Sequence, residues 1–336
     1  MTDMTLSRPV VTTDLKKVLT TAKKFHNRYF PGFDVSADQI RTVNGHMECI
    51  IDYAHELPAG IWNLGSVIPA LTTNTVIELE PFTLNGMTIS AESPLPNALP
   101  AGDLTSLGHM TAAEWKALTS FREESDTRPI LQGVLANPAN GEFCATDGAI
   151  FLTMDQPMLA ELSQQYVLPA FPAMGDGELF INEKDNIAEW HIPAGKKFPY
   201  AITLRGYCLH GQFPAYDRVI PDLADAITQQ TTTAQTLIAD THAVIAITKK
   251  NDSCRMDLVN GECVKKVGSD TMNITVEPIF PEALPSLLVD VRYWKTVLEA
   301  FPAGDALTVC LYGMEAPIMF TTPGVTAVMF PLRQPR

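Results

Sequence analysis

The feature that most limits how this chain of 336 residues can fold is an order of elements that recurs about three times. Each copy reads as a helix, a group of strands, a short helix and further strands, beginning near Asp14, Thr111 and Asp240. Such a repeated unit places its helices on one side of an antiparallel sheet, which predicts an α+β fold. We expect three domains of similar construction, at residues 1–104, 105–212 and 213–336.

Four helices are predicted where apolar residues recur with a period of about 3.6 residues. The first has Asp14 as its predicted N-cap, and the second follows a capping box made by Thr111 and Glu114. A less regular helix begins at Asp240, and a clear one begins at Asp290. Basic residues lie off the apolar faces of these helices: Lys16, Lys17, Lys23, Lys24, Lys116, Lys249, Lys250, Arg292 and Lys295.

Three further stretches carry local predictions. Residues 129–135 read as a strand, and the polar tract Gln229 to Gln235 reads as a loop. The two prolines between Tyr166 and Met174 predict that the short helix of the second copy is stunted or absent.

The overall charge narrows the function classes. A formal charge of −14 argues against a protein that coats nucleic acid with its whole surface, but it allows cations gathered on one inner face.

The six cysteines, without a C-x-x-C pair, are predicted to be small core residues, with a zinc site or disulfides as the alternative. No apolar run approaches the roughly 18 residues of a membrane span, and residues 1–8 lack a signal-peptide core. We therefore expect a cytoplasmic protein without a metal or cofactor.

An enzyme is the main competing class. The seven histidines are scattered, and no nucleophile elbow, phosphate-binding loop or dinucleotide fingerprint is present. Asp147, within a Thr-Asp-Gly turn, is expected to cap its own backbone rather than to act in catalysis. The sequence therefore predicts a protein that is not an enzyme.

Three segments carry a more specific signal. Residues 141–152 read as a strand, a turn in which Gly148 supplies the positive φ, and a second strand. Residues 211–221 have the pattern G-x-F-P-x-Y-x-R-V-x-P, and residues 327–333 read Ala-Val-Met-Phe-Pro-Leu-Arg. In this order and at about these separations, the three segments resemble those of the bacterial DNA polymerase III β sliding clamp.

The resemblance implies a fold and a function. Three clamp domains per chain, and two chains head to tail, would form a homodimeric ring with antiparallel sheets outside and helices lining the inside. Such a processivity factor encircles double-stranded DNA, tethers a DNA polymerase and is opened by a clamp loader. The basic helix faces would then contact DNA phosphates without reading sequence.

The resemblance also implies a hydrophobic pocket that binds short peptide motifs of the polymerase and the loader. Ala149 and Ile150 replace a polar pair of the family, which makes the rim more apolar and suits a divergent clamp encoded by a phage or plasmid. A clamp-fold decoy or regulator that does not encircle DNA is the alternative. The implied pocket residues are Leu131, Thr146, Gly148, Ala149, Ile150, Phe151, Pro214, Val219, Val328, Phe330, Pro331, Leu332 and Arg333.

Overall fold

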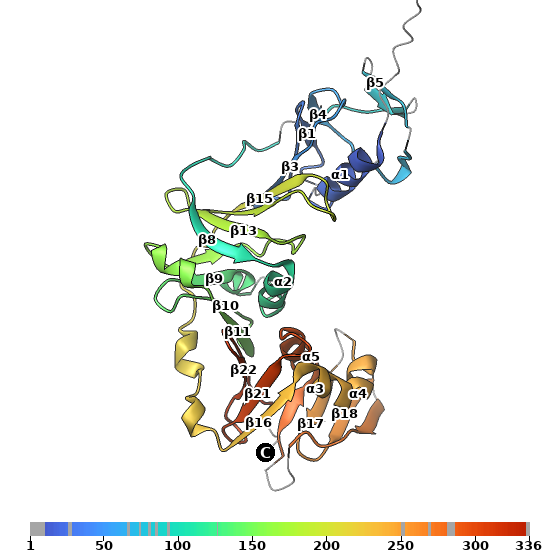
Figure 1. Cartoon of the computed structure of the whole chain (residues 1–336). Helices are drawn as coiled ribbons and strands as arrows, with labels where there is room; N and C mark the ends of the chain where they lie inside the picture. Colours follow the sequence, from blue (N-terminus) through green and yellow to red (C-terminus); the bar gives the residue numbers. More distant parts are fainter. Residues whose placement is uncertain are drawn as a thin grey trace, which may run out of the picture. The chain divides into compact units, whose positions relative to one another are not determined.

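The computed structural model describes residues 11–25, 29–65, 68–73, 75–79, 82–84, 87–92, 95–125, 127–249, 253–267, 270–280 and 286–333. The chain forms two compact units, coloured along the sequence in Figure 1. Unit 1 comprises Met1–Ala112 and Phe171–Cys208, and unit 2 comprises Ala113–Ala170 and Leu209–Arg336. The division into three domains stays a prediction.

Unit 1 is built on an antiparallel sheet whose order, among the described residues, is β4-β1-β2-β3-β15-β14-β13-β8. At its centre β3 pairs with β15, and Ile51 lies opposite Ile202. This pairing joins strands of the first and second predicted domains into one sheet. The strands are β1 Phe33–Val35, β2 Gln39–Val43, β3 Met47–Asp52, β4 Gly60–Trp62, β8 Thr105–Met110, β13 Gly177–Asn182, β14 Ile187–Ile192 and β15 Ala201–Tyr207.

Helix α1 (Thr13–Lys23) packs on β2 and β3 of this sheet. Its N-cap is Thr12, whose Oγ1 accepts a hydrogen bond from Leu15 N at 3.1 Å, so the predicted cap at Asp14 is wrong by two residues. Asp14 lies in the first turn, where a carboxylate interacts favourably with the helix dipole. The predicted apolar face is confirmed as buried: Leu15, Val18, Leu19, Ala22 and Phe25.

Smaller elements complete unit 1. The 3-10 helix η1 (Ile68–Ala70) contacts α1. The three strands that follow η1 in the sequence form a separate sheet of order β5-β6-β7. Its strands are β5 Ile77–Leu79, β6 Phe82–Leu84 and β7 Met87–Thr88.

Unit 2 has a second antiparallel sheet, whose described strands follow the order β12-β9-β10-β11-β23-β22-β21-β16. Its centre is the pairing of β11 with β23, where Phe151 lies opposite Val328. The strands are β9 Val134–Asn137, β10 Glu142–Thr146, β11 Ile150–Asp155, β12 Tyr166–Leu168, β16 Thr228–Thr233, β21 Ala306–Leu311, β22 Ile318–Thr322 and β23 Val325–Met329. A smaller sheet of order β19-β18-β17-β20 comprises β17 Ser253–Asp257, β18 Glu262–Val267, β19 Asp270–Thr275 and β20 Leu288–Asp290.

The helices of unit 2 are α2 Ala112–Ser120, which begins at the last residue of unit 1, α3 Ala234–Asp240, α4 His242–Ile247 and α5 Val291–Glu299. Helices α3, α4 and α5 pack on one another (Figure 1). The carboxylate of Asp290 caps α5 by accepting from Arg292 N at 2.9 Å. On its buried side the Trp294 ring meets Phe320 of β22 edge-on, with 5.7 Å between centroids, which anchors α5 to the sheet.

Two local predictions are wrong, and one is confirmed. Residues 129–135 begin as the 3-10 helix η2 (Pro129–Gln132), because Pro129 fits the start of a helical turn. The polar tract from Gln229 forms most of β16, since its β-branched threonines suit an edge strand paired with β21. The described backbone between Tyr166 and Met174 has a strand and no helix, as predicted. The remaining 3-10 helices are η3 Pro157–Glu161, η4 Tyr216–Val219 and η5 Leu223–Asp225.

The six cysteines are free and buried, which confirms the prediction of core thiols. Burial raises the pKa of Cys208 to about 12. Over the described ranges, no group of three or more His, Cys, Asp or Glu side chains is arranged to hold a metal ion. No helix in the described part of the chain is long and apolar enough to cross a membrane.

Candidate nucleic-acid interface and partner-binding site

The hairpin between β10 and β11 is held by its own side chains. Thr146 Oγ1 accepts a hydrogen bond from Gly148 N at 2.9 Å and donates one to the carbonyl of Ile150 at 2.7 Å. Asp147 Oδ1 accepts from the backbone N–H groups of Ala149 and Ile150 at 2.8 and 3.0 Å. Asp147 therefore caps its own turn, as predicted, and Gly148 has the expected positive φ, at 92°.

Arg128 fixes the turn from outside. Its guanidinium donates to the carbonyl of Asp147 and, at 2.5 Å, to Glu123 Oε2. The hydrogen bond from Arg128 lowers the pKa of Glu123 to about 2, so this carboxylate stays ionised and keeps the arginine in place. The hairpin tip is thus a preformed surface.

Two apolar clusters lie beside this hairpin, and Ile220 packs against both. Leu131 belongs to the first cluster, together with Phe213 and Tyr216 of the 211–221 segment. Phe151 and Val328 belong to the second, with Phe330 packed on it. The rings of Phe151 and Tyr216 are 6.3 Å apart, so the three sequence segments meet here.

The other predicted pocket residues are more dispersed. Phe330 N donates to the carbonyl of Ala149 at 3.1 Å, which joins the third segment to the hairpin tip. Pro331 and Leu332 are half-buried, Arg333 is exposed, and Pro214 and Val219 lie on the surface outside both clusters. Ile150 lines a different cavity, described below.

Sequence reasoning did not assign Tyr216 or Ile220 to the pocket. Tyr216 donates its hydroxyl to Glu142 Oε1 at 2.6 Å and accepts from Asn137 Nδ2 at 2.8 Å, and burial raises its pKa. The sequence does contain a pattern that could have identified both residues. Phe213, Tyr216 and Ile220 have the spacing of one face of a helical turn. Other cluster residues that the sequence did not assign to the pocket are Ile130, Leu135, Cys144, Val167, Leu209 and Phe213 in the first cluster, and Ala226, Cys310, Tyr312 and Met319 in the second.

A cavity of about 790 Å³ in unit 2 collects the predicted DNA-contact residues of that unit. Lys116, Lys249, Arg292 and Lys295 all line it, and Arg122 adds a cation. Four carboxylates share its wall: Glu123, Glu124, Asp147 and Glu299.

Part of that cationic charge is already paired. Arg292 Nη2 donates to Asp290 Oδ2 at 2.6 Å, and this hydrogen bond to the carboxylate raises the pKa of the guanidinium. Lys295 Nζ is 3.7 Å from Glu299 Oε1. Lys250, the other predicted contact, lies outside the described residues.

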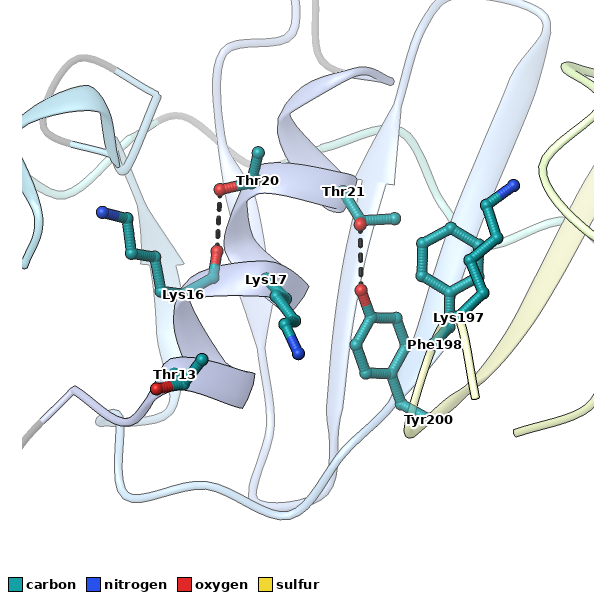
Figure 2. Close-up of a pocket in the computed structure, with 8 residues that line it drawn as sticks. All are labelled: Thr13, Lys16, Lys17, Thr20, Thr21, Lys197, Phe198 and Tyr200. Atoms are coloured by element: carbon teal, nitrogen blue, oxygen red, sulfur yellow. Dashed lines mark hydrogen bonds between the residues drawn. The ribbon is translucent and has the colours of Figure 1, made fainter. Parts of the chain in front are cut away.

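In unit 1 the predicted contacts lie on the outer side of α1. Lys17 and Lys24 are exposed, while Lys16 and Lys23 are half-buried. Lys16 and Lys17 line a cavity of about 270 Å³ together with Lys197, Phe198 and Tyr200 (Figure 2). The last three residues, from the loop after β14, were not predicted from the sequence.

The sequence matches no family model. It likewise matches no curated protein. Solved structures do resemble the chain along almost its whole length. The β subunit of DNA polymerase III from Caulobacter crescentus shares 16% identity at a TM-score of 0.66, over 96% of this chain and 98% of that one.

Two further structures were solved with bound molecules. The Helicobacter pylori β clamp bound to a DNA ligase peptide shares 12% identity at a TM-score of 0.71, over 97% of this chain and 99% of the other. The β sliding clamp of Bartonella birtlesii bound to griselimycin shares 16% identity at a TM-score of 0.67, over 97% and 99%. At these identities the likeness concerns the fold, and the chain has the α+β fold of the bacterial DNA polymerase III β sliding clamps.

Proposed function

We propose that this protein is a divergent sliding clamp that encircles double-stranded DNA as a homodimer and tethers a DNA polymerase to it.

 We further propose that the protein acts in the cytoplasm, binds a DNA duplex without reading its sequence and is not an enzyme.

The observation that carries this proposal is the sidedness of the helices. The face of α1 that contacts the sheet is apolar and buried, and its lysines lie on the other side. In α5 the same division separates Trp294 and Leu298 from Arg292 and Lys295. In a chain with a formal charge of −14, cations gathered on the outer faces of helices favour contact with a phosphate backbone at those faces.

The apolar clusters beside the hairpin support a partner-binding role. The half-buried residues packed on these clusters, such as Ile220 and Phe330, lie beside a rigid turn and suit an extended peptide with large apolar anchors, because little order must be created on binding. The Helicobacter pylori clamp was solved with a DNA ligase peptide. By analogy, we propose that short peptides of a polymerase and a clamp loader bind here.

A threading experiment tests encirclement without needing a loader. A linear duplex is fixed to a bead at one end, the protein is added, and the free end is then blocked with a bulky protein. After a wash at about 0.5 M salt, which removes electrostatic binding, a clamp stays on the blocked DNA. Cutting the DNA between bead and block must release it.

The same experiment separates the clamp from the decoy. A decoy does not remain on blocked DNA after the wash, although it still binds partner peptides. Solution mass provides a second readout, because the proposed ring requires a dimer of twice 36.8 kDa. A monomer at micromolar concentration that is not retained would overturn the proposed function.

A further inference from the structure

The cavity in unit 1 differs from the one in unit 2 in its charge. Of the described residues that line it, three are lysines and none carries a carboxylate: Thr13, Lys16, Lys17, Thr20, Thr21, Lys197, Phe198 and Tyr200. Asp14 Oδ1 lies 3.5 Å from Lys17 Nζ in an exposed and therefore weak pair. Most of the cavity wall is apolar, so an anion would be bound at its rim by the ammonium groups.

The loop 193–200 is tied to α1 by a buried contact. Tyr200, which is 2% exposed, shares a hydrogen bond of 2.9 Å between its Oη and Thr21 Oγ1. The ring of Phe198 lies 5.6 Å from that of Tyr200. The loop therefore has a defined position against the helix.

Lys197 is held in turn by the loop. Its Nζ lies 5.3 Å from the centroid of the Phe198 ring and donates to the carbonyl of Met174 at 2.5 Å. Figure 2 shows the side chain lying along that ring. One hydrogen bond leaves two N–H donors on the ammonium, and a side chain already held in place loses little entropy when it binds a ligand.

We propose that Lys197 is a further DNA-contact residue, and that it binds a backbone phosphate near those contacted by the lysines of α1. The loop after β14 would thus add a second phosphate-binding element to the helix predicted from the sequence. This inference rests on the proposed function, since the phosphate belongs to the bound duplex.

Salt-dependent binding of a fluorescent duplex tests the inference by anisotropy. Each phosphate contact adds about 0.9 to the slope of log K against log salt concentration. Lys197→Gln is expected to lower the slope by about that amount and to weaken binding at low salt. The matched control is Lys184→Gln, which removes one exposed lysine at the opposite end of β14 and should leave the slope unchanged.

A second variant tests the positioning of the loop. Tyr200→Phe removes the hydrogen bond to Thr21 without changing the charge, so weaker binding at an unchanged melting temperature supports the inference. If Lys197→Gln behaves as the wild type while Lys17→Gln lowers the slope, this inference fails and the proposed function stands. If the wild-type chain does not bind DNA at any salt concentration, both fail.

Discussion

Arg205 on β15 and Glu48 on β3 form a buried ion pair across the centre of the unit 1 sheet, with 2.9 Å between Nη1 and Oε1. The same guanidinium contacts Glu189 Oε1 at 2.7 Å and donates to the carbonyls of Leu99 and Pro100 at 2.9 and 2.6 Å. The Pro-rich stretch before β8 is therefore bonded to the sheet by an arginine.

Replacing this arginine is expected to destabilise the protein strongly. Arg205→Met removes the cation shared by two buried carboxylates and leaves Glu48 with Arg41, and Glu189 with His191, as their remaining partners. Breaking a buried pair in this way costs about 3–5 kcal/mol. The free energy of unfolding in urea measures the effect. The control Arg255→Met removes an exposed arginine of β17 and should change the value by less than about 0.5 kcal/mol. If both replacements lowered the free energy of unfolding equally, the stabilising role given to the buried ion pairs of Arg205 would be wrong.

Acid is expected to weaken the same network. Burial alone would raise the pKa of Glu189, but hydrogen bonds from His191 and Arg205 hold it below its usual value. Because the pKa of Glu189 is lower in the folded state, its ionised carboxylate contributes to stability above the unfolded pKa of about 4.3. This contribution to stability is lost as the pH falls through the folded pKa.

Unfolding measured between about pH 6 and pH 3 should therefore show a steeper loss of stability for the wild type than for Glu189→Gln. Glu178→Gln, at an exposed site on the neighbouring strand β13, serves as the control. Parallel curves for the wild type and Glu189→Gln would show that the pKa of Glu189 is not lowered.

The hairpin turn requires glycine at one position. At Gly148 φ is +92°, and an added Cβ would fall 2.4 Å from Arg128 Nη1. The arginine can move, but the left-handed backbone remains, so Gly148→Ala is expected to cost about 1–2 kcal/mol in thermal or urea unfolding. At Gly304 no atom lies within 4 Å of the added Cβ, and the backbone is not left-handed. Gly304→Ala should therefore be close to neutral.

Reversing the charge of α1 tests the DNA path. Replacing Lys16, Lys17, Lys23 and Lys24 with Glu should abolish retention in the threading experiment, because the phosphates would then meet carboxylates. The solution mass should stay that of the dimer. A control with the same change in net charge replaces four exposed cations elsewhere with Glu: Lys184, Arg218, Arg255 and Lys266. Retention of the α1 variant would refute the predicted role of this helix.

The partner site is expected to depend on Phe330. It packs against the cluster of Phe151 and Val328 while remaining half-buried, so it can contact a ligand. Phe330→Ala should weaken binding of a fluorescent peptide with Leu and Phe anchors by about tenfold or more. Met314→Ala removes an apolar side chain that is 43% exposed and lies outside both clusters, and it should not change the affinity.

Helix faces could be predicted from the sequence because a period of 3.6 residues records burial directly. The limits of elements were less predictable. Thr12 and Asp14 are both good caps, and only the extended backbone at Thr12 decides between them. The tract that forms β16 lacks an apolar alternation, so its pairing with β21 is a tertiary effect.

The candidate site shows the same division. The hairpin and the two other segments meet as their motifs predicted, but Ile150 and Phe151 face opposite sides of β11 because side chains alternate along a strand. The contribution of Lys197 could not be predicted, since a lysine in a loop has no periodicity. The pairing of β15 with β3 brings this distant loop beside α1.

The position of β23 in its sheet has a consequence for the order of folding. β23 lies between β22 and β11, so both of these strands present an unpaired edge until β23 is inserted. Unpaired edges favour pairing between chains, so self-association is expected to compete with refolding at high protein concentration.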